Sequence, residues 1–267
     1  SYCKEPYAYK SLQKGKVDLY KAFLERFFVV LRKSGRMGIV VPSGLYTDQG
    51  CQPLRKMFFS QGRVEFLYCF ENRWPAVFTA VDNRFKFITF STRKDGKTEE
   101  FKCAFMEHDP ERLPIIHKNA LKINLTQAKK FSPHSLTLIE FKSQADIYIT
   151  TKIYNGLPTL GEHIEGAWNL ELSQEFNRSS DSDLFNSDGD GCALYEGKNT
   201  NSFDHKFLPI NYWIREDVVR ENEYRSRWRI LRKKSRLPSK YDFEQFRGAF
   251  RRIAASTNER SFIATVI

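Results

Sequence analysis

The residues best suited to chemistry lie in one loop, whose sequence from Glu71 is "ENRWPAVFTAVDNRFKF". Trp74 and Phe78 fall between two segments that have the composition of β-strands, so their rings would lie at the rim of a sheet. An exposed ring there can stack on an unpaired base, a contact worth roughly 1–3 kcal/mol per base. Both rings could instead pack down on the loop or on the next helix. The residues alone leave the two interpretations open.

A basic stretch supplies the second group of candidates. Between Arg215 and Arg252 there are thirteen Lys or Arg against six Asp or Glu, in a chain whose net charge is +11. A concentrated basic surplus attracts polyanions, and double-stranded DNA is the commonest of these in a cytosol. A merely solvated surface is the alternative. The candidates for phosphate contacts are Arg225, Arg227, Arg229, Arg232, Lys233 and Lys234. Three more flank the predicted terminal hairpin and could contact phosphates or read base edges, namely Arg247, Arg251 and Arg252.

Metal chemistry is poorly supported. Asn186, Asp188, Asp190 and Gly191 imitate part of a calcium-binding loop, but position one should be Asp, and position twelve falls on Gly197 instead of Glu. A turn-rich surface loop is therefore the preferred interpretation. The five cysteines stand singly, and no two histidines have the spacing of metal ligands on a helix, so we expect no metal site. Scattered thiols in odd number fit a reduced, cytoplasmic protein.

An α/β fold has to position these groups. Val17–Ser34 is predicted to be an amphipathic helix, and strand, helix and three further strands follow it. This order is typical of the second half of a doubly wound sheet, and no first half precedes it. The helix stripe consists of Tyr20, Phe23, Phe27, Val30 and Leu31, widened by Leu24 and Phe28. The later elements are Met37–Val41, Cys51–Ser60 and strands beginning at Arg63, Arg84 and Glu100.

The remaining length is enough for a second domain. An apolar fraction of 41% supports real cores, and the absence of an apolar run of about 18 residues argues against a membrane span. From about Phe131 the composition and hydrophobic pattern of the sequence change, and "FKSQADIYITTKIYNGLP" predicts one more helix. The end, "FRGAFRRIAASTNERSFIATVI", predicts two strands around a turn at Ser256–Glu259. Because the second strand runs to the last residue, we expect the natural chain to continue.

A longer comparison of motifs points to a family. The stretch "KGKVDLYKAFLERFFVVLRKSGRMGIVVPSGLYTDQGCQPLRKMFF" resembles the segment after the catalytic motif in gamma-type adenine-N6 DNA methyltransferases, especially the fused restriction–modification methylases of type IIG. The shared features run in order from Asp18 to Phe87: a helix "DLYxxFxER", a strand "G…IVP", a helix with "LR", a strand ending near "F-EN" and a loop with a phenylalanine. Downstream, "LYEGKNTNSFDHKF" and the terminal segment resemble the target-recognition region of these enzymes.

This resemblance implies a fold and a function. Residues 1–135 would be the distal half of a Rossmann-like methyltransferase sheet, and residues 136–267 an α+β target-recognition domain. The parent enzyme would extrude an adenine from double-stranded DNA in a prokaryotic cytoplasm and methylate its amino group. Phe78 matches the loop phenylalanine that stacks on the extruded base, with Trp74 as its neighbour.

Two family motifs are absent from the sequence. One is the glycine-containing strand–loop that holds S-adenosylmethionine, and the other is the Asn-Pro-Pro-aromatic motif that binds the adenine amino group. We therefore expect this chain to hold no catalytic residue and to be inactive without the N-terminal catalytic half of the same polypeptide. The alternatives are a stand-alone DNA-binding specificity protein or a methylase remnant. An RNA-binding module lacks its usual motifs here, and a purely structural α/β domain is the third possibility.

Overall fold

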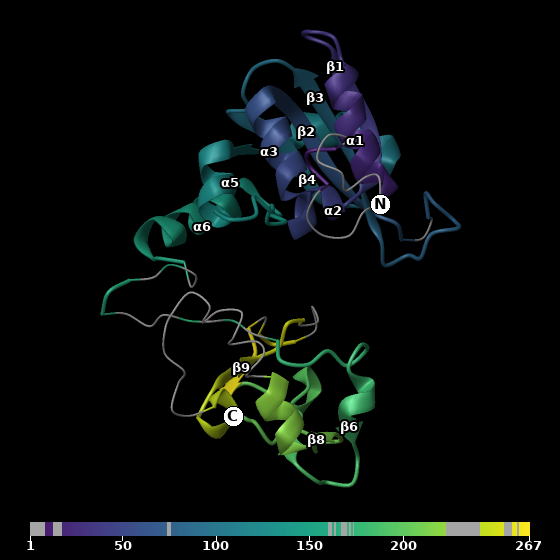
Figure 1. Cartoon of the computed structure of the whole chain (residues 1–267). Helices are drawn as coiled ribbons and strands as arrows, with labels where there is room; N and C mark the ends of the chain where they lie inside the picture. The colour runs from purple at the N-terminus through teal and green to yellow at the C-terminus, as the bar shows by residue number, and fades with distance from the viewer. Residues whose placement is uncertain are drawn as a thin grey trace. The chain divides into compact units, whose positions relative to one another are not determined.

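The structure of the chain is a computed structural model, which describes residues 9–12, 18–73, 76–159, 162, 164–166, 170, 172, 174–222, 241–253, 258–260 and 262–267. It divides into two compact units, Ser1–Asn169 and Leu170–Ile267. Figure 1 shows the elements of each unit. None of the described helices is long and apolar enough to cross a membrane.

The first unit is built on a five-stranded mixed sheet with the strand order β1-β3-β2-β4-β5. β3 lies between β1 and β2 and is antiparallel to both, so β1 and β2 run parallel to each other. β4 is parallel to β2, and β5 closes the far edge antiparallel to β4. The strands are β1 (Arg36–Pro42), β2 (Gly62–Glu71), β3 (Lys86–Lys94), β4 (Glu100–Glu107) and β5 (Leu121–Asn124). The helices are α1 (Leu19–Val30), α2 (Gly44–Thr47), α3 (Gln52–Gln61), α4 (Leu113–Asn119), α5 (Leu125–Phe131) and α6 (Gln144–Gly156), with 3-10 turns η2 (Gln49–Cys51) and η3 (Pro110–Arg112).

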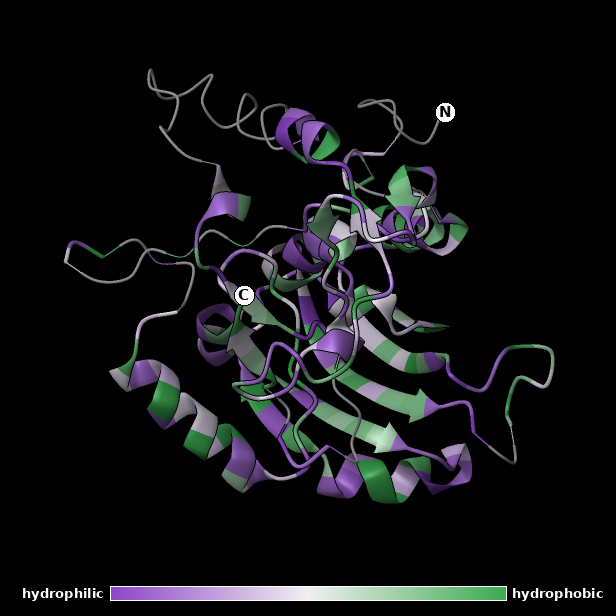
Figure 2. Ribbon diagram, turned by 90° about the horizontal axis from the view of Figure 1, so that it is seen from below, coloured by the Kyte–Doolittle hydropathy of each residue, from purple (hydrophilic) through white to green (hydrophobic). Residues whose placement is uncertain are grey.

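Both faces of this sheet are covered. In β2, Leu67 and Cys69 belong to the large core that includes α1 and α3, whereas Tyr68 and Phe70 belong to a smaller core with Ile116 of α4. Successive side chains of a strand point to opposite faces, so a strand buried on both sides has a nearly continuous apolar sequence. Figure 2 shows the hydropathy of the residues along these strands. The predicted strands and helices of this unit are present, with ends that differ from the predicted ones by a few residues.

α1 buries only part of the predicted stripe, because Tyr20 and Leu31 pack against the core while other members face outward. Leu24 and Phe28 are buried against the sheet, whereas Phe23 and Phe27 are largely exposed. The polar Glu25 is buried too, because its carboxylate accepts hydrogen bonds from the backbone N–H groups of Lys10 and Ser11 at 2.8 and 2.9 Å. The periodicity correctly predicted the helix but did not separate the buried members of the stripe from the exposed Phe23, Phe27 and Val30, since both sides of the helix carry large apolar residues.

The compact units divide after Asn169, whereas the predicted boundary between the methyltransferase part and the recognition region, after residue 135, stays a prediction. Leu136, Leu138 and Phe141 belong to the core of the first unit, and the backbone N–H of Leu138 donates to the carbonyl of Tyr46 at 3.1 Å. The change in sequence texture near Phe131 therefore marks the end of α5 and not the end of a compact unit. The α6 prediction lies in this segment and is confirmed.

The second unit contains two small sheets. The order of one is β6-β8-β7, and β9 and β10 form an antiparallel pair in which Ala264 faces Phe250. The predicted terminal hairpin is thus present, although part of its turn lies outside the described residues. The two-residue strands of the other sheet are too short to give a periodic pattern, and the sequence did not indicate them. The strands are β6 (Phe185–Asn186), β7 (Cys192–Ala193), β8 (Trp213–Ile214), β9 (Gly248–Phe250) and β10 (Ala264–Val266), with 3-10 turns η4 (Ser182–Leu184), η5 (Gly197–Asn199) and η6 (Asp242–Glu244).

Candidate functional site at the carboxyl edge of the sheet

The carboxyl ends of β1 and β2 meet at one edge of the five-stranded sheet, because these strands run parallel. β1 passes through Pro42 into α2, and β2 ends at Glu71. β3 begins at the same edge with Lys86, whose carbonyl accepts a hydrogen bond from the backbone N–H of Ser43 at 3.0 Å. Ligands of α/β sheets gather at this edge, so the polar groups here form the candidate site.

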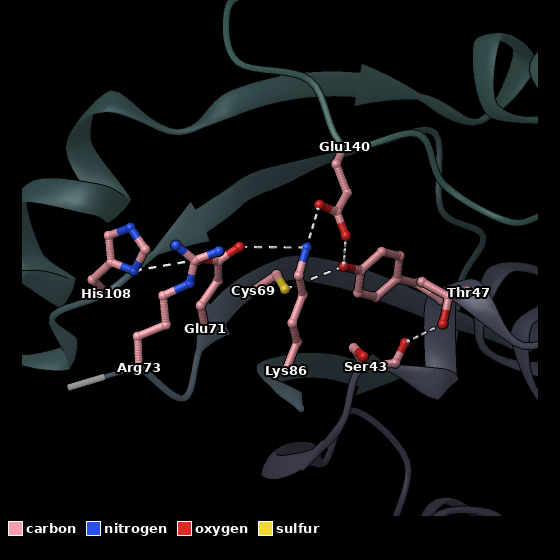
Figure 3. A network of polar contacts seen from close by, with 9 residues as sticks. Ser43, Thr47, Cys69, Glu71, Arg73, Lys86, His108 and Glu140 are labelled. Atoms are coloured by element: carbon pink, nitrogen blue, oxygen red, sulfur yellow. Dashed lines mark hydrogen bonds and ion pairs between the residues drawn. The ribbon is translucent and has the colours of Figure 1, made fainter. Parts of the chain in front are cut away.

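A chain of ion pairs runs along this edge (Figure 3). The carboxylate of Glu71 lies 2.8 Å from Arg73 Nε, 3.7 Å from Lys86 Nζ and 3.7 Å from His108 Nδ1. Lys86 Nζ also donates to Glu140 Oε2 at 2.7 Å. Burial is the largest single influence on the pKa of Lys86 and lowers it, but the hydrogen bond to Glu140 and the attraction of the nearby acidic groups together outweigh it, so the net pKa is raised and the ammonium stays charged.

The buried end of this network holds no activated nucleophile. Tyr46 Oη donates to Glu140 Oε1 at 2.6 Å and lies 3.1 Å from Cys69 Sγ. Burial is the largest cause that raises the pKa of both Tyr46 and Cys69, so the phenol and the thiol are neutral near pH 7. The role of this network is therefore structural: its hydrogen bonds hold the segment around Glu140 at this edge of the sheet.

The loop between β2 and β3 is organised by Asn72, a buried residue. Its Nδ2 donates to the carbonyls of Phe78 and Val81 at 2.9 and 3.0 Å, and its Oδ1 accepts from the backbone N–H of Phe78 at 2.9 Å. Its own backbone N–H donates to the carbonyl of Phe85 at 3.2 Å. One side chain thus fixes the backbone at Phe78 and Val81.

Phe78 combines packing with exposure. Its ring meets Phe87 edge-on, with centroids 5.0 Å apart, and Phe87 in turn stacks on the buried Phe70 at 5.4 Å. The ring of Phe78 nevertheless remains 41% exposed. It therefore rests on the core and still offers surface to a ligand at the carboxyl edge. Its neighbour in the sequence-based prediction, Trp74, lies outside the described residues.

The predicted DNA-contacting residues are only partly described. Arg225, Arg227, Arg229, Arg232, Lys233 and Lys234 lie outside the described residues. Arg247 forms an ion pair with Glu175, and Arg251 Nε donates to the carbonyl of Thr200 at 2.9 Å. Both side chains therefore hold segments of the second unit together, whereas the side chain of Arg252 is exposed.

The calcium-like stretch forms a turn. Asn186 Nδ2 donates to the carbonyl of Asp190, and the carboxylate of Asp188 accepts from the N–H of Asp190. Among the described residues there is no cluster of three or more His, Cys, Asp or Glu side chains that could hold a metal ion.

Four residues of the candidate site at this edge were not identified from the sequence: Tyr46, Asn72, Lys86 and Glu140. The sequence does contain a pattern that could have identified Asn72. The motif "F-EN" at the end of a strand is part of the same family resemblance from which Phe78 was chosen. Glu140 had no such pattern, since it lies 54 residues from Lys86 and meets it only in the folded chain.

Comparison with known proteins supports the resemblance inferred from the sequence, but only over the first part of the chain. Residues 3–75 match the family model described as Eco57I restriction-modification methylase. No curated protein sequence matches the chain. Solved structures with weak similarity include the EcoKI M protein of a type I restriction enzyme, with 10% identity over 52% of this chain and 41% of that chain at a TM-score of 0.39.

Two others are a modification subunit of a putative type I restriction enzyme from Vibrio vulnificus YJ016 and the type IIG restriction endonuclease BpuSI. The first has 14% identity over 49% of this chain and 32% of that chain at a TM-score of 0.37. The second has 11% identity over 88% of this chain and 32% of that chain at 0.38. The chain spans less than half of the length of each, and at such TM-scores these similarities carry no weight for function. The family match confirms the resemblance to restriction–modification methylases over residues 3–75.

Proposed function

We propose that this chain is part of an adenine-N6 DNA methyltransferase of a prokaryotic, cytoplasmic restriction–modification system, in which it forms one wall of the pocket for the extruded base and contributes to DNA recognition. The observation that carries this proposal is the loop clamped by Asn72, which holds Phe78 half-exposed at the carboxyl edge of the sheet. A ring fixed in this way can stack on an extruded adenine without first paying the entropy of ordering the loop.

Methyl transfer itself is assigned to another part of the polypeptide. The sequence has no glycine-rich loop for S-adenosylmethionine and no Asn-Pro-Pro-aromatic motif. The charged groups at the carboxyl edge are paired with one another, so these residues do not fit the cofactor. When bound by the catalytic half, the cofactor would supply the methyl group, and the residues described here would hold the base.

The exposed face of α1 supports the existence of such a catalytic half. Leu19, Phe23, Phe27 and Val30 form a stripe of large apolar side chains that no other described element covers. β1, beside this helix, is the outermost strand of the sheet, and its Val40 is exposed as well. Apolar helix faces and open strand edges are usually covered in functional proteins. The catalytic half would add a strand to β1 and pack on α1.

The second unit is proposed to bind duplex DNA. Its described part carries exposed Arg252, and the basic stretch from Arg225 to Lys234 belongs to the same unit by sequence. Contacts of arginine and lysine with phosphates give affinity that falls steeply with salt. Sequence choice would depend on side chains that reach base edges.

The test is Phe78→Ala in the 267-residue chain, with binding measured on a perfect duplex and on the same duplex with one mispaired adenine. The variant should bind the mispaired duplex about five- to a hundredfold more weakly and the perfect duplex nearly normally, because stacking on an unpaired base is worth about 1–3 kcal/mol. Phe27→Ala is the matched control, since Phe27 is 43% exposed but lies on α1. Equal loss on both duplexes would exclude the stacking role and favour a DNA-binding specificity protein without a base pocket.

A further inference from the structure

A cleft adjoins the loop that carries Phe78. Its volume is about 400 Å³, and its lining residues come from both stems of the loop: Glu71 and Arg73 on one side, Asn83, Arg84 and Lys86 on the other. Three of the five lining side chains are cations. A cationic cleft at the base of a loop that also carries the exposed aromatic residues Phe78 and Phe85 brings to one loop the two features that proteins use to hold an unpaired stretch of nucleic acid.

Arg84 is the cation most available to a ligand. Lys86 is held by Glu140, and Arg73 by Glu71. The partner of Arg84 is Asp82, which accepts hydrogen bonds from Arg84 Nε at 2.9 Å and Nη2 at 2.7 Å.

This pair with Asp82 lies in water, because the Arg84 side chain is 84% exposed, and such pairs contribute little to stability. The guanidinium carries five N–H donors, so it can bind a phosphate while Asp82 keeps its place. The hydrogen bond from Arg84 also lowers the pKa of Asp82 to about 2, so the carboxylate of the turn keeps its charge further into the acidic range.

The neighbouring ring, Phe85, is 62% exposed on a fixed backbone. Its N–H donates to the carbonyl of Asp82 at 3.0 Å, and its carbonyl accepts from the N–H of Asn72 at 3.2 Å. Asp82 also accepts from the N–H of Arg84 at 2.9 Å, which closes the turn. These hydrogen bonds fix the backbone at Phe85. Phe85 lies in the sequence between Arg84 and Lys86, which line the cleft, and is not itself part of the lining. The turn therefore fixes the backbone at two consecutive exposed residues, a guanidinium in the cleft and an apolar ring next to it in the sequence, which suit a ligand with a negative charge and an apolar face.

We propose that this cleft is a second nucleotide subsite, which binds a nucleotide next to the extruded adenine: its phosphate lies in the cleft on Arg84, and its base or sugar reaches out of the cleft to Phe85. The inference rests on the DNA binding of the proposed function and deepens it. Phe78 holds the extruded base, whereas the Arg84–Phe85 turn holds the adjoining strand away from the duplex. Two subsites on one loop would keep the strand open while the base is in its pocket.

The experiment uses the 267-residue chain and the duplex with one mispaired adenine. Single phosphates near that adenine are replaced one at a time by neutral methylphosphonate. Arg84→Gln should weaken binding to the unmodified duplex about tenfold. At one or two linkages beside the adenine, methylphosphonate should cost the wild-type chain a similar factor and cost Arg84→Gln nothing more.

Phe85→Ala should lose about fivefold, and this loss should vanish when the nucleotide beside the adenine is made abasic or when its phosphate is neutralised. Both substituted side chains are exposed, so the variants should fold like the wild type. The matched control is Arg36→Gln, because Arg36 also has an exposed side chain paired with a carboxylate, Glu65, at the other end of the sheet. Adenosine monophosphate at millimolar concentration should not displace the duplex, since a free nucleotide lacks the neighbouring contacts.

The subsite is overturned if Arg84→Gln loses no more than Arg36→Gln, or if every methylphosphonate costs the variant as much as the wild type. Displacement by adenosine monophosphate would instead assign the cleft to a free nucleotide and overturn the DNA assignment. Phe78→Ala measured on the same duplexes separates the two proposals. A mismatch-specific effect of Phe78→Ala with silent Arg84 and Phe85 variants removes only the subsite. A silent Phe78→Ala with a phosphate-specific Arg84 effect removes the base pocket and leaves the subsite as a backbone-binding site.

Discussion

The two units of the chain are stabilised in different ways. The first unit encloses two hydrophobic cores on either side of a five-stranded sheet, and most of its strands have seven to ten residues. The second unit has strands of two or three residues, and Ile214, Val219 and Ile263 are the buried hydrophobic side chains among its described residues. Its segments are joined by polar contacts such as Arg247–Glu175 and Arg251–Thr200.

This difference has a consequence for function. A deep core can hold a loop such as the one clamped by Asn72 in one conformation, because packed side chains resist displacement. A unit with few buried contacts opens more easily and can adapt its surface to a partner. The candidate base-binding loop thus lies on the first unit, which has the large hydrophobic cores. The proposed DNA-reading residues lie on the second unit, which has few buried hydrophobic side chains among its described residues.

The largest effect should come from the core of the first unit. Phe58 is buried between Phe28 and Phe90, with ring centroids 5.3 and 5.0 Å away. Phe58→Ala should lower the free energy of unfolding of this unit by about 3–5 kcal/mol, because it removes apolar contacts and leaves a cavity. Denaturation in urea would measure the loss. Phe27→Ala, on the exposed face of α1, should cost less than about 1 kcal/mol. Similar losses for the two variants would contradict the assignment of the buried face.

Two buried asparagines give a sharper comparison. Asn72 fixes the loop at Phe78, while Asn199 in the second unit donates to the carbonyl of Pro209 at 2.6 Å and accepts from the N–H of Glu196 at 2.9 Å. Each substitution by Ala should cost about 1–3 kcal/mol, since it leaves backbone groups without partners.

The two asparagine variants should differ in how much of the surrounding backbone becomes accessible to solvent exchange. Amide hydrogen exchange would measure this difference. Asn72→Ala should speed exchange only in the loop, because the core beneath it is intact. Asn199→Ala should speed exchange across the described second unit, whose few buried residues give it little other support. Uniform acceleration of the first unit by Asn72→Ala would show that the loop is part of its cooperative core.

The smallest effect concerns alkaline pH. Burial raises the pKa of Cys103 to about 12, and burial, followed by the charge of Cys103, raises that of Tyr68 to about 12. Groups whose pKa is raised on folding contribute stability below their unfolded pKa, and this stability is lost as the pH rises toward the folded value. Between pH 8 and 10 the first unit should therefore lose about 1 kcal/mol through Cys103 alone. Urea denaturation at the two pH values would measure this loss, and Cys103→Ala should reduce it. An unchanged loss in that variant would rule out Cys103 as its source.

The sequence predicted the first unit better than the second, for a physical reason. Strands such as β2 and β3 are long and buried on both faces, so their apolar runs are visible without any tertiary information. β6, β7 and β8 have two residues each and exist only because they pair with one another. For the same reason α6 was predicted correctly, whereas β5, with four residues, was not recognised.

The candidate site was predictable in part. Phe78 was found through the resemblance, and the structure adds the clamp by Asn72 that holds it. Its role in base stacking stays a prediction, as do the DNA contacts of Arg252 and of the basic stretch. Arg247 and Arg251 looked equivalent to Arg252 in the sequence, but their guanidinium groups are engaged within the second unit.

The sequence by itself determined the kinds of elements in the first unit and their order, because periodicity, glycine and proline act locally. It also determined the absence of a cofactor loop from this chain. The tertiary structure decided which face of α1 is buried, that β3 lies between β1 and β2, and that Glu140 meets Lys86. These are choices among alternatives of similar local energy, and contacts between residues far apart in the chain decide them.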